Sequence, residues 1–280
     1  MEKSLKYILA EHKLVLKKAY GQNFLTDENL LAEIAEKAGV TESDTVLEIG
    51  CGAGALTREL SKRAKKVIGY EIDERLKPVL SETLQSFDNV KIVYKDIMKE
   101  NLAELEKSLG GEYKIVANLP YYITTPIVMN FIENSSALTS MSIMVQEEVA
   151  DRFSAAPATS DYGAITVAIN LRGSAKTVLK VPREKFTPVP NVDSAVVKID
   201  IEKGKFAGAD FNAVRNCVRA GFSSRRKMLV NNLINGLKLT REQAESVLTA
   251  ADIPLTARGE TLSAEDYIRL TEIVKTVKNG

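Results

Sequence analysis

Short apolar runs alternate with helical segments between residues 26 and 201, and this alternation limits the possible folds most strongly. The expected strands are residues 45–49, 66–72, 90–94, 113–117 and 141–145. A first helix is expected to begin at a Thr26 or Asp27 cap and to stop at Gly39. Because parallel neighbours need a long connection, strands separated by helices predict a largely parallel α/β sheet.

The pattern changes after residue 162, where strand-like runs follow one another without long helices between them. These runs are 164–171, 177–181 and 194–201, and they predict an antiparallel hairpin at the edge of the sheet. Residues 203–209 form a Gly/Lys-rich break, after which the periodicity is helical. We therefore expect one domain over 1–202, with a basic arm at 1–25, and a small helical domain over 203–280.

Composition excludes several classes of site. The chain has one histidine, His12, and two cysteines, too few for a disulfide framework or a zinc site, so we expect no metal. The first eighteen residues lack a signal-like apolar core, and no apolar run could span a bilayer, so we expect a cytoplasmic protein.

Residues 201–280 hold 13 Lys and Arg against 9 Asp and Glu, whereas the rest holds 25 against 28. A basic C-terminal part suits a phosphate-bearing partner.

A glycine-rich turn follows the first strand and indicates a nucleotide cofactor. The run Glu48–Gly54 contains Gly50, Gly52 and Gly54, which let the backbone bend sharply beside a ligand. Glu71 ends the second strand, where it can accept hydrogen bonds from both ribose hydroxyls, and Asp96 ends the third, where it can read an adenine edge. The spacing differs from the dinucleotide and Walker patterns. A cofactor without phosphates, S-adenosylmethionine, fits these groups.

The fourth strand ends in Asn118-Leu119-Pro120-Tyr121, followed by Tyr122. This motif could be a rigid structural turn whose aromatic side chains only fill space, but each residue also suits methylation of an adenine amine. The Asn118 side-chain oxygen and the Leu119 carbonyl can accept hydrogen bonds from N6, and Pro120 holds that carbonyl in place. Tyr121 offers a face on which a flipped base can stack. We expect Pro126 in the first turn of the next helix, capped by Thr124 or Thr125.

With these motifs the chain resembles the ribosomal RNA adenine dimethyltransferases of the KsgA type over essentially its whole length. The motifs that carry the resemblance are residues 21–25, 48–57, 118–121, 146–152, 161–163, 186–194, 222–227 and 258–263. The resemblance implies a Rossmann-like class I methyltransferase with a mostly parallel seven-stranded sheet. It also implies that Asn23 and Leu25 contact the cofactor and that Phe186 and Tyr121 sandwich the target adenine. The usual proline and leucine of the glycine loop are Cys51 and Ala53 here, and we expect a loosened turn.

The resemblance further implies dimethylation of two adjacent adenines in a small-subunit ribosomal RNA hairpin, with S-adenosylhomocysteine as by-product. The implied partner is the immature small ribosomal subunit, and we expect a monomer. The candidates for gripping the RNA backbone are Arg215, Arg219, Arg225, Arg226 and Lys227. The alternatives are an Erm-type enzyme acting on large-subunit RNA, a non-catalytic ribosome-assembly or transcription factor, and a small-molecule methyltransferase.

Overall fold

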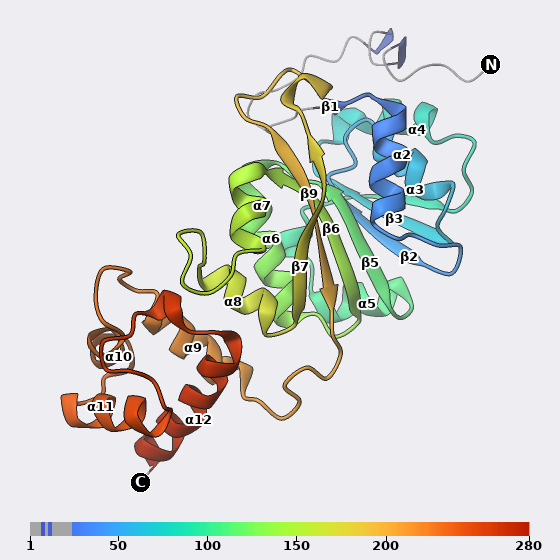
Figure 1. Cartoon of the computed structure of the whole chain (residues 1–280). Helices are drawn as coiled ribbons and strands as arrows, with labels where there is room; N and C mark the ends of the chain where they lie inside the picture. The colour runs from blue at the N-terminus through green and yellow to red at the C-terminus, as the bar shows by residue number, and fades with distance from the viewer. Residues whose placement is uncertain (1–6, 9–10, 13–23, 280) are drawn as a thin grey trace. The chain divides into compact units, whose positions relative to one another are not determined.

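A seven-stranded sheet forms the centre of the first compact unit in the computed structural model, which describes residues 7–8, 11–12 and 24–279 (Figure 1). Its strand order is β4-β3-β2-β5-β6-β9-β7. The bounds are β2 Thr45–Ile49, β3 Lys66–Glu71, β4 Val90–Tyr94, β5 Tyr113–Asn118, β6 Leu138–Gln146, β7 Gly173–Val181 and β9 Ser194–Ile201. The pairs among β2 to β6 are parallel, whereas β9 runs antiparallel to β6. The predicted fold class is confirmed.

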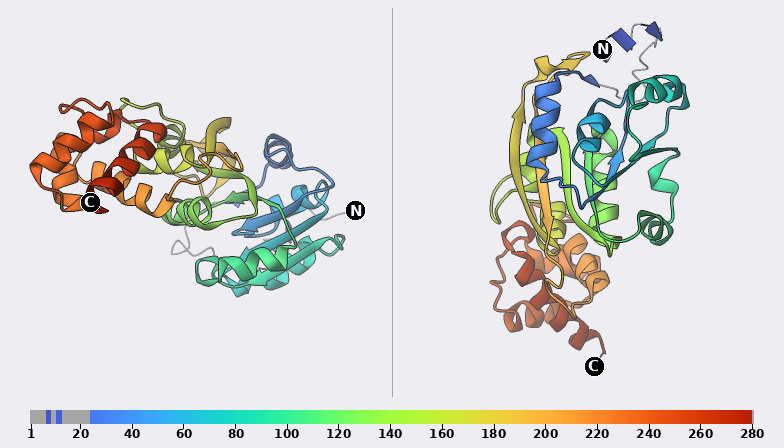
Figure 2. Two further views of the ribbon diagram at one scale, coloured as in Figure 1. Left: turned by 90° about the horizontal axis from the view of Figure 1, so that it is seen from below. Right: turned by 90° about the vertical axis from the view of Figure 1, so that its right-hand side faces the viewer.

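Helices cover both faces of this sheet (Figure 2). Their bounds are α2 Glu28–Lys37, α3 Ala55–Ser61, α4 Lys77–Thr83, α5 Leu102–Leu109, α6 Tyr121–Asn134 and α7 Glu147–Phe153. The predicted cap of the first helix forms, because the Asp27 side chain accepts a hydrogen bond from the Leu30 N–H at 3.2 Å. That helix buries Leu31 and Ile34, as its apolar spacing predicts. Among the described residues, no helix is long and apolar enough to cross a membrane.

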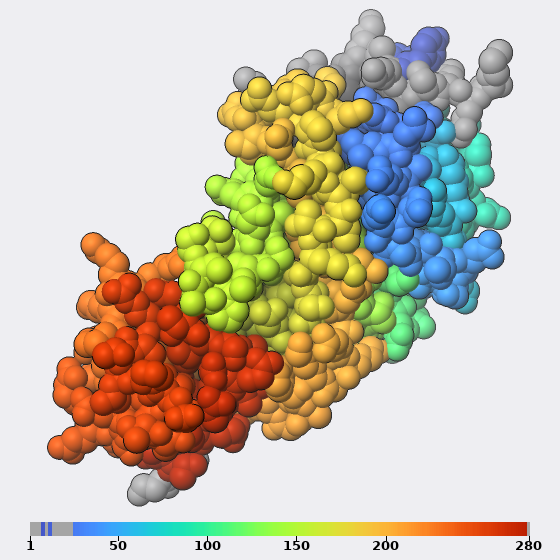
Figure 3. Space-filling model, viewed as in Figure 1, coloured from blue at the N-terminus to red at the C-terminus, as the bar shows by residue number. Residues whose placement is uncertain are grey.

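The strand register brings the functional segments to one edge of the sheet. Thr45 of β2 pairs with Lys66 of β3 and with Tyr113 of β5, so these three strands begin side by side. Their carboxyl ends, from which the glycine turn, Glu71 and Asn118 follow, therefore lie together. A small second sheet pairs β1 (Phe24–Leu25) with β8 (Phe186–Thr187). The β8 segment lies beside α2 (Figure 3), where Lys185 Nζ is 2.7 Å from Asp27 Oδ2.

Two predictions of secondary structure were wrong, one of a strand and one of where a helix begins. Residues 164–171, expected to be a strand, form α8 (Ala164–Asn170), with the Val167 N–H bonded to the Gly163 carbonyl at 3.1 Å. A short continuous apolar run fits a buried helix as well as a strand, and this helix is buried almost all round. Helix α6 begins at Tyr121 with Pro120 as its cap, so Pro126 lies inside it rather than in its first turn. Pro126 removes the N–H that would otherwise bond to the Tyr122 carbonyl.

The second compact unit contains residues 202–280, which begin near the predicted boundary at 202, together with residues 151–174, which we had placed in the first domain. Its further helices are α9 Phe211–Gly221, α10 Leu229–Leu237, α11 Arg241–Ala250 and α12 Ala264–Asn279. Tyr162, Val167 and Leu171 share one hydrophobic core with these helices. The Tyr162 hydroxyl also donates to the Leu262 carbonyl at 2.9 Å. Burial of these apolar side chains attaches residues 151–174 to the helical unit.

Candidate cofactor and catalytic site

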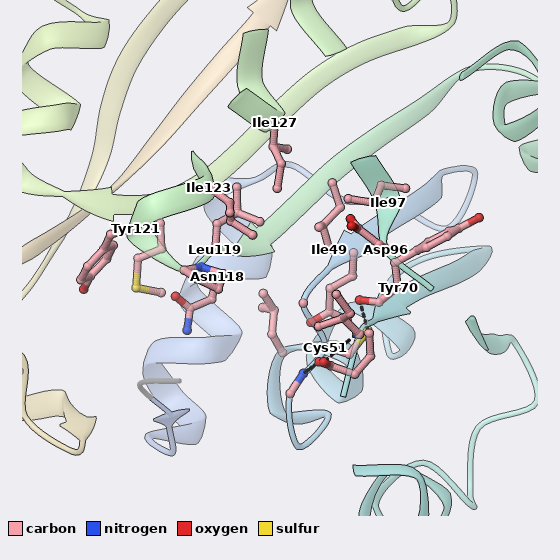
Figure 4. Close-up of a pocket in the computed structure, with 18 of the residues that line it drawn as sticks. Ile49, Cys51, Tyr70, Asp96, Ile97, Asn118, Leu119, Tyr121, Ile123 and Ile127 are labelled. Carbon is pink, nitrogen blue, oxygen red and sulfur yellow. Dashed lines mark hydrogen bonds between the residues drawn. The ribbon is translucent and has the colours of Figure 1, made fainter. Parts of the chain in front are cut away.

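A cavity of about 340 Å³ lies at the carboxyl ends of the parallel strands in the first unit. Figure 4 shows Asn118 and Tyr121 on one side of it and Asp96 on the other. The cavity brings together most of the predicted site: Leu25, Gly50, Gly52, Glu71, Asp96, Asn118, Leu119, Pro120 and Tyr121 all line it. The motifs of four separate strands therefore form one site.

The glycine-rich turn adopts the backbone conformation that its composition predicts. Gly50, Gly52 and Gly54 have φ angles of 77°, 55° and 84°, all in the left-handed region. Gly54, however, does not line the cavity. It caps α3, and a Cβ there would lie 3.1 Å from Leu80 Cδ2 of α4. Both its left-handed φ and its packing against α4 require glycine here, and the cofactor contact of Gly54 stays a prediction.

Cys51 and Ala53, which replace the family's usual residues, are both buried. A Cβ added at Gly69 of β3 would overlap the Cys51 sulfur, so the thiol occupies the space that this glycine leaves open. Burial raises the pKa of the Cys51 thiol well above its usual value, and a thiol that stays protonated is a poor nucleophile. Ala53 packs with Ile8 and Val79 in a small apolar cluster. Both residues are tightly packed, in contrast to the loosened turn that we expected.

Glu71 organises the backbone around it. Its Oε2 accepts from the Gly52 N–H at 2.8 Å, and its Oε1 accepts from the N–H groups of Ile72 and Asp73, each at 2.8 Å. Burial raises the pKa of Glu71, while these three amide donors act in the opposite direction. A carboxylate offers about four acceptor positions. Three are already used, which leaves one on Oε2 for a ligand hydroxyl rather than the two that we predicted.

Asp96 lines the cavity on the side opposite Asn118 and Tyr121 (Figure 4). Its Oδ1 caps a short 3-10 helix, Ile97–Lys99, by accepting from the Met98 N–H at 3.0 Å. Its Oδ2 lies 4.0 Å from the largely exposed Lys99 ammonium. The cap holds the carboxylate in place, and Oδ2 retains acceptor capacity toward the cavity. This arrangement suits an exocyclic amine, which presents two N–H donors.

Glu48 is the most deeply buried carboxyl group of the cavity lining, with 1% of its surface exposed. Its Oε2 is buried without a hydrogen-bond partner among the described residues. Burial, together with the nearby charge of Glu71, raises the pKa of Glu48 to about 8. At neutral pH Glu48 is therefore mostly protonated in the folded protein.

The Asn118–Tyr121 segment connects the end of β5 to the start of α6. Leu119 is buried, and Pro120 caps the helix by accepting from the Ile123 N–H at 3.1 Å. The Tyr121 hydroxyl lies 2.8 Å from the Ser194 Oγ at the start of β9, and this hydrogen bond fixes the ring at the cavity wall. The segment is thus held at both ends, as a site that acts by positioning requires.

One residue predicted for the site lies away from the cavity, and another is outside the described part of the chain. Phe186 is 2% exposed, does not line the cavity and packs in a hydrophobic core. Asn23 lies outside the described residues. His12, which showed no partner in the sequence, has its Nε2 2.9 Å from Glu82 Oε2. Sequence reasoning missed the apolar wall formed by Ile72 and Met98, whose only signal was their position directly after the strand-end acids.

The predicted RNA-contacting residues all belong to the second unit. Arg219, Arg225, Arg226 and Lys227 are exposed, and no ion pair is found for them within the described part of the chain. Arg215 is half-buried, one turn before Arg219 on α9. The segment 223–228 after α9 therefore presents adjacent cations to solvent, together with the exposed side chain of Met228.

Known proteins resemble the chain over nearly its whole length. The family model described as ribosomal RNA adenine dimethylase matches residues 14–275. Proteins named ribosomal RNA small subunit methyltransferase A are 42% identical in Bacillus pumilus, over 96% of this chain and 95% of that protein, and 42% identical in Clostridioides difficile, over 97% and 95%.

Two solved structures support the same assignment. A dimethyladenosine transferase from Plasmodium falciparum is 26% identical with a TM-score of 0.78, covering 91% of this chain and 98% of its own. The 23S rRNA methyltransferase ErmE is 30% identical with a TM-score of 0.70, covering 90% and 100%. The family match and the strand-end site agree: the chain belongs to the ribosomal RNA adenine dimethylase family of S-adenosylmethionine-dependent methyltransferases.

Proposed function

We propose that the chain adds two methyl groups to N6 of each of two adjacent adenines in a small-subunit ribosomal RNA hairpin. Its partner is the immature small ribosomal subunit in the cytoplasm, on which it acts as a monomer. The observation that carries the proposal is the single cavity in which Asn118 and Tyr121 lie opposite Asp96. The names of the full-length bacterial relatives support the small subunit as the source of the substrate.

The lining of the cavity fits S-adenosylmethionine. Glu71 retains an acceptor position for a ribose hydroxyl, and Asp96 Oδ2 can accept from an adenine amine. Ile72 and Met98 supply apolar surface for the adenine ring. Among the lining residues that the structure describes, Lys95 alone is basic, which suits a cofactor without phosphates. When bound, this cofactor supplies an electrophilic methyl group on sulfur.

Asn118 and Leu119 prepare the nucleophile. The N6 lone pair of adenine is delocalised into the ring, so the amine attacks poorly while it is planar. In the first transfer the Asn118 side-chain oxygen and the Leu119 carbonyl accept its two N–H donors and favour a tetrahedral nitrogen. In the second transfer the one remaining N–H donates to one of these acceptors. Once methylated, N6 would be cationic and would lose a proton to water. The mechanism needs no general base, and catalysis comes from positioning.

Tyr121 gives the target base a stacking surface. The bond from its hydroxyl to Ser194 holds the ring before the substrate arrives, so less side-chain entropy is lost on binding. Aromatic stacking of an extruded base contributes about 1–3 kcal/mol. Phe186 remains the predicted second face of the sandwich. Because Phe186 is buried in the core, that role requires the β8 segment to move when RNA binds.

The exposed cations of the second unit supply the grip on the RNA backbone. Arg219, Arg225, Arg226 and Lys227 present positive charge without competing ion pairs among the described residues. Contacts to phosphate bind the stem independently of its sequence, while the loop base is extruded. Recognition is therefore divided between a charged helical unit, which binds the backbone, and the cavity, which binds the target base.

Mass spectrometry of ribosomal nucleosides tests the proposal. Cells or extracts with this protein should contain dimethyladenosine in small-subunit RNA, and those without it should lack the modification. Asn118→Ala should bind S-adenosylmethionine as tightly as the wild type does but lose methylation by at least about 100-fold. Full activity of Asn118→Ala would refute the mechanism. Dimethyladenosine appearing in large-subunit RNA instead would favour the ErmE-like alternative, which the structural similarity also allows.

A further inference from the structure

Tyr122 is a large aromatic side chain with no role in the site described so far. It lines the mouth of the cavity and is 64% exposed, the highest value among the exposed large hydrophobic side chains of the described chain. No hydrogen bond, ion pair or ring contact is found for it within the described part of the chain. An exposed aromatic ring beside a ligand cavity is typical of a binding contact.

The position of Tyr122 on α6 separates its ring from that of Tyr121. Both residues lie in the first turn of α6, where successive side chains point about 100° apart. Tyr121 is held at the wall by Ser194, so Tyr122 must project in a different direction, toward solvent. The two rings therefore cannot stack on the same base, and any aromatic contact of Tyr122 is with a different group.

The helix beneath Tyr122 makes a firm base for such a contact. Helix α6 buries Ile127, Val128 and Phe131 against the rest of the first unit. Ile123, one residue after Tyr122, also lines the cavity. A tyrosine side chain has only two rotatable χ angles, so fixing it on a ligand costs little entropy.

We propose that Tyr122 stacks on the nucleotide next to the target adenine, a role that rests on the proposed function. Extrusion of the target base breaks its stacking with both neighbours and leaves each with an uncovered face, one of which can meet Tyr122 at the cavity mouth. The Tyr122 ring covers that face and stabilises the opened strand. Tyr121 thereby holds the base that reacts, and Tyr122 positions the base beside it.

Steady-state methylation of unmethylated small ribosomal subunits tests the proposal with three variants. Tyr122→Ala removes the ring, Tyr122→Leu keeps apolar bulk without an aromatic face, and Tyr122→Phe keeps the ring without the hydroxyl. If stacking is the function, Tyr122→Ala and Tyr122→Leu should lower kcat/KM by about 5- to 150-fold, mainly through KM. Tyr122→Phe should stay within about twofold of the wild type, because the ring carries the contact.

A change in the RNA identifies the base that Tyr122 contacts. Small subunits carrying uracil at one of the two nucleotides that flank the adenine pair present a weaker stacking partner and keep both target adenines. Uracil on the contacted side should lower kcat/KM for the wild type and have a smaller effect on Tyr122→Ala, since the contact is already absent. Equal effects of uracil on both proteins, at both flanking positions, would overturn the proposal.

Other outcomes separate this role from its alternatives. Rescue by Tyr122→Leu would show that apolar bulk suffices, and loss in Tyr122→Phe would assign the function to the hydroxyl; either result overturns the proposal. An equal loss of S-adenosylmethionine affinity in Tyr122→Ala, measured by calorimetry, would place Tyr122 in the cofactor site instead. If the wild type methylates large-subunit RNA only, the proposed function fails, and the same variants then test Tyr122 on that RNA.

Discussion

Glu48→Gln should change how the stability of the protein depends on pH. Burial raises the pKa of the folded Glu48 to about 8 from its usual value of 4.5. The folded protein therefore holds a proton between these pKa values that the unfolded chain releases. For a carboxyl group whose pKa is raised on folding, stability is greatest below the lower pKa and is lost as the pH rises toward the upper one.

The magnitude follows from the shift. One pKa unit corresponds to about 1.4 kcal/mol, so Glu48 lowers the free energy of unfolding by about 1.4 kcal/mol for each pH unit in this window. Integrated from about pH 5 to about pH 8, the loss is about 3.5 kcal/mol. Glutamine does not titrate, so Glu48→Gln removes this slope. Any constant cost of burying its amide displaces the whole curve without changing how it depends on pH.

Urea unfolding followed by circular dichroism at several pH values measures the difference. The free energy of unfolding of Glu48→Gln minus that of the wild type should rise by about 3.5 kcal/mol from about pH 5 to about pH 8. Glu36→Gln, which removes one exposed carboxylate from α2, is the matched control and should follow the wild type throughout. A difference between Glu48→Gln and the wild type that stays constant with pH would refute the proposed protonation of Glu48.

Two further predictions concern the turn and the charged segment. Gly69→Ala should lower the free energy of unfolding by about 1–3 kcal/mol, because its Cβ overlaps the Cys51 sulfur, and adding Cys51→Ala should restore part of the loss in a urea titration. Replacing Arg225, Arg226 and Lys227 by Gln should weaken RNA binding. The slope of log K against the logarithm of salt concentration should become less steep by about 2 to 3. Replacing the exposed Lys37 and Lys65 should change neither the affinity nor the slope.

The parallel sheet, and the position of the site at the carboxyl ends of its strands, could be predicted because they depend on strong local sequence patterns. The strand 45–49 was predicted to the residue, and the site groups follow directly from strand ends. Residues 164–171 were misassigned because apolar content without a clear period does not distinguish a buried helix from a strand. Their membership of the helical unit depends on contacts distant in sequence, such as that between Tyr162 and Leu262.

Predicted site residues that carry polar chemistry line the cavity, whereas two others are placed by packing. Gly54 and Gly52 look alike in the sequence, but Gly52 lines the cavity and Gly54 lies close to α4 instead. Phe186 belongs to a motif assigned to the target base, yet it is buried in a hydrophobic core in this conformation. The local sequence does not show the packing of Gly54 or Phe186, because folding brings their partners close from distant parts of the chain.

Glu71 shows why side-chain chemistry alone overestimates what a site residue can bind. From the sequence it is a free carboxylate with capacity for two ribose hydroxyls. In the fold it accepts from three backbone N–H groups, including that of Gly52 in the glycine turn. These bonds satisfy donors that burial would otherwise leave unpaired, so the carboxylate stabilises the turn before any ligand binds. Glu71 therefore shapes the cofactor site as well as contacting the ligand, and changing it alters both properties at once.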